Sequence, residues 1–329
     1  MHQLWGLMPL MRLIFEFQTG YPQQLRPFVQ YSRRNNLQVE MLLTQQMPLF
    51  LENMNTLDKI LRPYMALTAP LTARHVDALL VSFPQLTRNV YCYAVWAGHL
   101  DLLRFMLPRV RNVYYSATEI AAHLGQLDVL VYLDGHKLAT FSHLTLHWAS
   151  RQGHLKVVEF LHPRIATDHA FAMDAAACHG HFDVVKFLHT NRTEGCTTKA
   201  MDSAAQHGHL EIVKFLHRHR SEGCTTAALD MAAANGHLEL VKFLHWNRTE
   251  GATTTAMTLA CCNGHLDVVK FLFEHRSEGC TIQALIGARE ASHWDVVSFL
   301  LQHGKELHLD VPQPSFRHSS YALQTFLIF

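Results

Sequence analysis

Residues 191–218 read NRTEGCTTKAMDSAAQHGHLEIVKFLHR, residues 219–246 read HRSEGCTTAALDMAAANGHLELVKFLHW, and residues 247–274 read NRTEGATTTAMTLACCNGHLDVVKFLFE. One unit therefore occurs three times in succession with a period of 28 residues. Self-similarity at a fixed period of about 20–50 residues is typical of stacked repeats, in which each unit buries its apolar face against its neighbours. We therefore expect a solenoid in which the same local structure recurs every 28 residues.

Each unit predicts two helices separated by a glycine turn. The segment from Thr198 to His207 has an alanine-rich face, Thr197 or Thr198 is a suitable N-cap, and Gly208 stands where a helix ends with positive φ. The segment from His209 to about residue 217 has an apolar stripe wider than half its circumference. The first helix is thus expected to pack closely on small side chains, and the second to be covered on more than one side.

The glycine of this turn recurs along much of the chain, with intervals of 27 or 28 residues. Its positions are Gly98, Gly125, Gly153, Gly180, Gly208, Gly236 and Gly264, followed by Ser292. The array of eight units then spans about residues 85–303, and residues 71–83 read as the second helix of a degenerate unit that caps it. We expect three regions: a helical N-terminal region at 1–70 with short helices on either side of Pro48, the array at 71–303, and an irregular tail at 304–329.

The unit resembles the ankyrin repeat, whose pattern TPLHxAAxxGHxxVVxxLL is matched by TLHWASRQGHLKVVEFLH at 145–162 and by AMDSAAQHGHLEIVKFLH at 200–217. The resemblance implies an all-α fold: an ankyrin-type α-solenoid of stacked helix-turn-helix repeats. The usual ankyrin unit has 33 residues, so a period of 28 implies shortened hairpin loops. The family's first-helix histidine survives only as His147, and aspartate replaces it at Asp174, Asp202 and Asp230. The partner of these carboxylates must be a hydrogen-bond donor.

Composition argues against nucleic-acid or membrane partners. With a formal net charge of +1 and no block of like charge, the chain has no cluster of basic residues of the kind that binds nucleic acid or an acidic membrane. The first twenty residues are apolar but lack a positive n-region and are interrupted by Pro9, Arg12 and Glu16, so they make a poor signal peptide and are too short to span a bilayer. Seven cysteines without a CxxC pair indicate reduced thiols. We expect a cytoplasmic protein, or a secreted one if the true N-terminus lies elsewhere.

No catalytic, cofactor or metal motif stands apart from the repeats. The run from Cys178 to His181 contains zinc-ligand types, but His181 is the recurring histidine after the turn glycine, which we expect to hydrogen-bond across the turn between its helices. Arg192 and its counterparts form a ladder, but Glu194 and its counterparts neutralise it, which favours salt bridges within the loops. Catalytic groups are normally singular, whereas these recur every 28 residues. We therefore predict no enzymatic activity and no cofactor.

A repeat solenoid without catalytic residues is expected to bind another protein, through the exposed side of the first helices and the loops entering them. The slot two residues before the turn glycine varies between units, and the N-terminal units supply residue types favoured at binding hot spots. The candidate binding residues are Trp96, His123, Trp148, Arg151, Cys178, Lys199, Gln206 and Asn235. The expected function is a monomeric, non-catalytic protein-interaction scaffold or adaptor. Two alternatives remain open: a substrate-targeting subunit, for example of a ubiquitin ligase, and a secreted effector, as suspected for similar arrays in some protists.

The 25 histidines support one physical expectation. Protonation below about pH 6 would add a large positive charge to a nearly neutral chain, so stability should depend on pH in that range.

Overall fold

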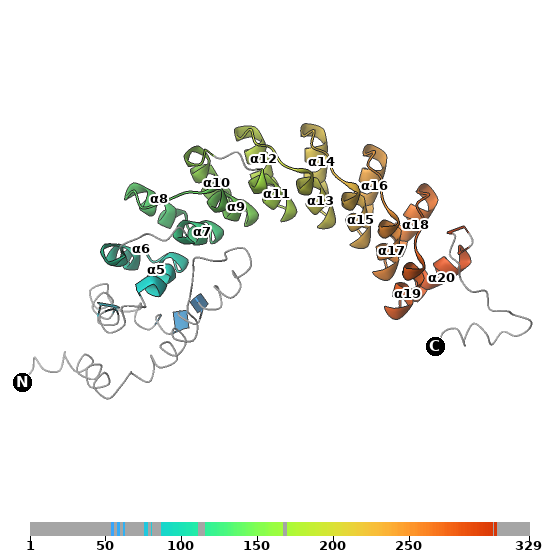
Figure 1. Ribbon diagram of the computed structural model, residues 1–329, viewed down its shortest axis with the longest axis horizontal. Coiled ribbons are helices and arrows are strands. Elements are labelled where there is room, and N and C mark those ends of the chain that lie inside the picture. Colours follow the sequence, from blue (N-terminus) through green and yellow to red (C-terminus); the bar gives the residue numbers. More distant parts are fainter. Residues whose placement is uncertain are drawn as a thin grey trace, which may run out of the picture. The chain divides into compact units, whose positions relative to one another are not determined.

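The computed structural model describes residues 54–55, 58–59, 62, 76–77, 80, 87–110, 116–166, 170–304 and 306–307. Within these ranges, residues 87–302 form sixteen α-helices, paired into eight helix–turn–helix units, and contain no strand (Figure 1). The predicted all-α repeat fold, with loops too short for hairpin strands, is confirmed. The helices contact one another as two compact units that divide after Thr167, and each is described by itself.

The first unit contains three helix pairs and two short 3-10 turns. These are α5 (Thr87–Trp96), α6 (Leu100–Met106), η3 (Leu107–Arg109), α7 (Ser116–His123), α8 (Leu127–Gly135), α9 (His143–Arg151), α10 (Leu155–Leu161) and η4 (His162–Arg164). The second unit contains five pairs. These are α11 (Phe171–Cys178), α12 (Phe182–Asn191), α13 (Thr198–Gln206), α14 (Leu210–His219), α15 (Thr226–Ala234), α16 (Leu238–Asn247), α17 (Thr254–Cys262), α18 (Leu266–His275), α19 (Ile282–Glu290) and α20 (Trp294–Gln302).

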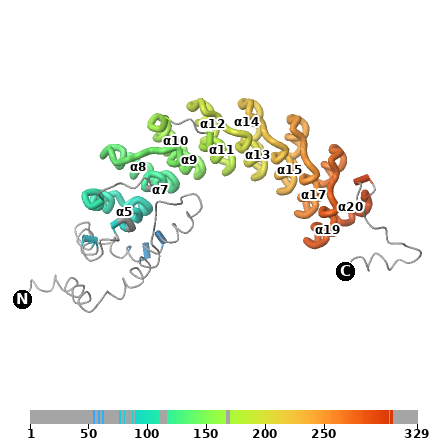
Figure 2. Tube along the Cα trace, in the orientation of Figure 1, coloured from blue at the N-terminus to red at the C-terminus, as the bar shows by residue number. Residues whose placement is uncertain are grey.

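Within the second unit, the first helices of the pairs form one row and the second helices form another (Figures 1 and 2). Neighbouring first helices contact each other more extensively than neighbouring second helices do. The cause is their composition: Ala200, Ala204 and Ala205 are fully buried in α13, and side chains this small let helices approach closely. In α14, Ile212, Val213 and Leu216 are buried, each contributing about 1.5–3 kcal/mol.

The turn within each pair has the geometry that its glycine predicts. Gly208 has a φ of 78°, the amide of His209 donates to the carbonyl of Ala204 at 2.9 Å, and this ends α13 in a left-handed cap. In the last pair Ser292 takes the same conformation with a φ of 61°. The predicted N-cap is also present, because the Thr197 hydroxyl accepts the amide of Lys199 at 3.2 Å.

The predictions for the chain ends lie largely outside the described residues. This applies to the two short helices expected at 37–60, to the cap at 71–83 and to most of the tail at 304–329. Of the described residues there, Met54, Val76 and Leu80 are buried. In the described part of the chain, no helix is both long and apolar enough to cross a membrane.

Candidate interaction surface

The polar residues that define the repeat are used to join one repeat to the next. Asp230 accepts two hydrogen bonds from Thr253, from its amide at 2.8 Å and from its hydroxyl at 2.7 Å. The pairs Asp174–Thr197 and Asp202–Thr225 have the same geometry and the same separation of 23 residues. The expectation that each aspartate faces a donor is confirmed. Each threonine also caps the helix that follows it, so the carboxylate fixes where the next repeat begins.

The histidine after the turn glycine also contacts the neighbouring repeat. Nε2 of His237 lies 3.2 Å from the carbonyl oxygen of Gln206, and Nε2 of His154 lies 3.0 Å from that of His123. The predicted bond across its own turn is therefore wrong, because the ring points toward the turn of the preceding repeat. A Cβ on Gly208 would lie 2.7 Å from the His237 ring, so the glycine is needed for this approach as well as for its φ.

The arginine and glutamate ladders pair within each loop, as predicted. Arg220 pairs with Glu222, and the equivalent pairs are Arg192–Glu194, Arg248–Glu250 and Arg276–Glu278. The Glu222 carboxylate also accepts the amide of Cys196 from the preceding loop, at 3.3 Å. Burial acts to raise the pKa of Glu222, but hydrogen bonds from Arg220 and from backbone amides outweigh it and lower the pKa to about 2. These charges are therefore internal to the stack.

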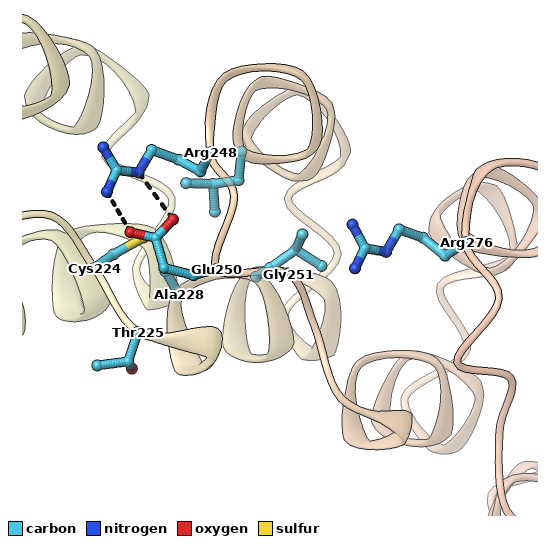
Figure 3. A pocket seen from close by; sticks show the side chains of 9 residues that line it. Cys224, Thr225, Ala228, Arg248, Glu250, Gly251 and Arg276 are labelled. Carbon is cyan, nitrogen blue, oxygen red and sulfur yellow. Dashed lines mark hydrogen bonds and ion pairs between the residues drawn. The ribbon is translucent and has the colours of Figure 1, made fainter.

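Figure 3 shows the hollow beside one such pair, with the Arg248–Glu250 bonds facing the Cys224 sulfur. The hollow leaves about 10 Å³ for the centre of a water-sized molecule, which is about the space of one water. It is therefore far smaller than the clefts that bind small molecules. The described residues also contain no cluster of three or more potential metal ligands. The exposed surface is thus the more suitable place for binding than this hollow.

In the first unit, the structure brings three of the candidate residues together. The Trp148 ring packs edge-on against the His123 ring at 5.2 Å, and the Arg151 guanidinium lies 5.4 Å from the Trp148 ring centre. Trp148 is only 2% exposed, so its predicted role as a surface anchor is wrong: the indole is buried in α9 and packs against His123 at the end of α7. His123 and Arg151 are half-buried above it. Burial, then the nearby His154 and Arg151, lower the pKa of His123.

Trp96 and Cys178 are half-buried at the ends of their helices. The Trp96 ring lies 5.8 Å from that of Tyr93 on the same helix, α5. The Cys178 sulfur lies 3.9 Å from Nδ1 of His207, which also lies 2.8 Å from the Ser203 carbonyl. Nδ1 of His207 therefore contacts the backbone of its own helix as well as the Cys178 sulfur.

The remaining candidates, Lys199, Gln206 and Asn235, are exposed. Asn235 and Gln206 lie together, because the Asn235 amide donates to the Gln206 carbonyl at 3.1 Å and to that of Met231 at 2.9 Å. Lys199 lies in the first turn of α13. The side chains of Lys199 and Gln206 thus project from the two ends of one first helix.

One set of inter-repeat contacts was not predicted. The rings of His189, His217 and His245 each pack edge-on against a phenylalanine of the next repeat, at 5.3–5.5 Å between centres: Phe215, Phe243 and Phe271 respectively. The recurring FLH at 187–189, 215–217 and 243–245 is the signal that could have indicated it.

The comparisons with known proteins agree with this architecture. A protein-family model described as ankyrin repeats (3 copies) matches residues 146–228, 172–250 and 229–310, which together span residues 146–310. No curated protein matches the chain.

Proposed function

Because the chain belongs to the ankyrin-repeat family, whose repeats are general protein–protein interaction modules, we propose that it is a non-catalytic scaffold or adaptor that binds a protein along its first helices. Ankyrin-repeat proteins are typically non-catalytic. The recurring aspartates Asp174, Asp202 and Asp230 are occupied by hydrogen bonds to a threonine of the next repeat, and the recurring loop arginines pair with glutamates.

The observation that carries the proposal is the contrast between these recurring residues and the exposed ends of the first helices. Aspartate, threonine, arginine and glutamate recur and pair internally, as for Asp230 with Thr253. Lys199 and Gln206 project from α13 into solvent, and the equivalent slots hold other residues in other repeats. Specificity is expected where the framework allows the sequence to vary.

We place the contact on two patches, one in each compact unit. In the first unit it comprises Trp96, His123 and Arg151, with buried Trp148 as their support. In the second unit it comprises Cys178, Lys199, Gln206 and Asn235. Arginine and tryptophan are frequent among residues that dominate binding energy, and reversing an exposed charge that faces an opposite charge of the partner places like charges together, which is costly.

The test is affinity purification of the full chain with mass spectrometry, comparing Lys199→Glu with Arg218→Glu. Both are exposed cations of the same repeat and undergo the same charge change, but Arg218 lies on the second helix, α14. We expect Lys199→Glu to reduce recovery of a specific partner at least about tenfold, the scale of roughly 1.4 kcal/mol. Equal recovery with both variants, or loss only with Arg218→Glu, would contradict the placement.

Substitutions are preferable to truncation at residue 85. The carboxylate of Asp58 accepts the Tyr93 hydroxyl at 2.9 Å, and Asp77 pairs with Arg109 at 2.8 Å. Removing residues before 85 would break these contacts and uncover apolar surface, so a lost partner could reflect damage to the first repeat.

A further inference from the structure

The most exposed large apolar side chain in the described part of the chain is Trp246, which is 66% exposed in the last turn of α16. In the two neighbouring repeats the same slot holds Arg218 and Glu274. A single exposed apolar residue is common on protein surfaces and needs no explanation by itself. The groups around the indole therefore decide whether it belongs to a binding site.

Two histidine rings stand beside the indole, and the three ring planes are steeply inclined to one another. The ring centres of Trp246 and His245 lie 4.4 Å apart with 78° between the planes, and those of Trp246 and His275 lie 5.7 Å apart with 86° between the planes. The two imidazoles lie 5.8 Å apart at 75°. Among the described residues, these imidazoles are the only rings that contact the indole, and no cation lies over its face. Exposed aromatic faces attract cations, and tryptophan does so most strongly.

Hydrogen bonds define what the two imidazoles present to a ligand. Nδ1 of His275 lies 3.0 Å from the carbonyl oxygen of Phe271, which can only accept, so in the neutral ring Nε2 is left as an acceptor. Nδ1 of His245 lies 3.4 Å from Nη1 of Arg276, which can only donate, so this Nδ1 accepts. The cluster thus offers aromatic faces and a hydrogen-bond acceptor.

The ends of two helices favour positive charge at this place. α16 ends at Asn247 and α18 ends at His275, and the carbonyl end of a helix carries a partial negative charge of about half a unit. In α14 the last turn contains Arg218, which complements this charge. The same slot holds Trp246 in α16 and Glu274 in α18. Glu274 is exposed and has no ion-pair partner among the described residues.

The arginines that follow these helices do not supply the missing cation. Arg248 pairs with Glu250 and Arg276 with Glu278, and the two arginine side chains are only 22% and 18% exposed. Their charges are therefore neutralised inside the stack. The Glu274 carboxylate and the ends of α16 and α18 remain without a compensating positive charge at the surface.

We propose that Trp246, His275 and Glu274 form a binding site for an arginine side chain of a protein partner. The guanidinium stacks on the exposed indole face and donates hydrogen bonds to the Glu274 carboxylate and to Nε2 of His275. Arginine is favoured over lysine because its planar guanidinium stacks on aromatic rings and holds several donors in fixed directions. The site lies on the second helices and is separate from the contact proposed for the first helices.

Nuclear magnetic resonance of the full chain tests the proposal through the indole Nε1–H signal of Trp246, which is assigned by its loss in Trp246→Phe. The probes are the capped tripeptides Gly-Arg-Gly and Gly-citrulline-Gly, which have nearly the same shape, although only arginine is charged. We expect the arginine peptide to shift the signal in a saturable manner and the citrulline peptide to bind at least about fivefold more weakly. The indole of Trp294, which is 48% exposed on α20, is the internal control and should not respond.

A pair of charge-removing variants tests the role of the carboxylate. Glu274→Gln keeps the size of the side chain, and we expect it to weaken binding of the arginine peptide about threefold or more. Glu239→Gln is the matched control, because Glu239 is an exposed carboxylate of α16 that already pairs with Lys242 at 2.8 Å. This control should bind the arginine peptide as the wild type does.

Three results would overturn the proposal. One is the absence of a shift of the Trp246 signal, and another is an equal response to both peptides, which would show an indole that does not discriminate charge. The third is wild-type affinity in Glu274→Gln. None of them bears on the first-helix contact, which Lys199→Glu tests separately.

Discussion

At the scale of single residues, the turn glycine serves two requirements at once. Gly208 has a φ of 78°, a conformation that costs an L-residue about 1–2 kcal/mol. It also allows the His237 ring of the next repeat to approach the backbone. An added methyl group would therefore strain this turn and push away the imidazole that bonds to the Gln206 carbonyl.

We expect Gly208→Ala to lower the free energy of unfolding by about 2 kcal/mol or more, from backbone strain together with a weakened inter-repeat hydrogen bond. Gly135→Ala is the matched control, because it lies in the last turn of α8 and an added Cβ would meet nothing within 4 Å. Alanine is the better helix former, so this control should be neutral or slightly stabilising. Urea unfolding monitored by circular dichroism measures both, and equal effects of the two variants would refute the double role of Gly208.

Several residue roles could be predicted from one repeat, while others could not. The Gly208 conformation and the Thr197 cap depend on local backbone geometry, which the pattern of one unit specifies. The partner of His237 and the burial of Trp148 depend on how a neighbouring unit is placed. A repeat period predicts that neighbours stack, but it does not specify which side chain reaches across.

At the scale of secondary-structure elements, two interactions fix the start of each first helix in the regular repeats: an N-cap within the helix and a hydrogen bond to the preceding repeat. The Thr225 hydroxyl accepts the amide of Ala227 at 3.2 Å and donates to the Asp202 carboxylate at 2.9 Å. One side chain thus caps α15 and ties it to α13. The helix could be predicted from its apolar spacing. For Asp202 the sequence predicted only that its partner is a hydrogen-bond donor, and it did not identify that donor as Thr225.

We expect Thr225→Ala to destabilise the protein by about 1–2 kcal/mol, because it removes an N-cap and leaves Asp202 without one of its donors. Thr225→Ser keeps the hydroxyl and should retain most of the stability. Hydrogen exchange should show the loss concentrated in the first turn of α15. A serine variant as unstable as the alanine variant would show that the methyl group, and not the hydroxyl, is what matters.

At the scale of the whole molecule, the second-helix histidines form a contact that recurs in the second unit. Burial, then Arg220 and His219, lower the pKa of His189, while Glu222 acts in the opposite direction. His245, two repeats later, has the same environment. Burial, then Arg276 and His275, lower its pKa, and Glu278 opposes them.

The sign of the resulting pH dependence follows from these directions. A histidine whose pKa is lower in the folded state binds a proton more readily in the unfolded chain, near pH 6.5. Its contribution to stability is therefore present above about pH 6.5 and is lost as the pH falls toward the folded pKa. Two buried carboxyl groups act in the opposite direction: burial raises the pKa of Glu119 to about 7 and also raises that of Asp174.

We expect the thermal midpoint to depend on pH between pH 7.5 and pH 5.5, where protonation of the histidines with lowered pKa values lowers it and protonation of Glu119 and Asp174 opposes them. The double variant His189→Phe with His245→Phe removes part of the histidine contribution, so acidification should lower its midpoint less, or raise it more, than in the wild type, and Phe273 shows that the slot accepts phenylalanine. His136→Phe, an exposed histidine outside these contacts, is the control and should keep the wild-type dependence. Differential scanning fluorimetry at both pH values measures the three proteins. A midpoint that does not change with pH in the wild type, or a pH dependence that the double variant retains in full, would show that these histidines do not couple protonation to the stability of the stack.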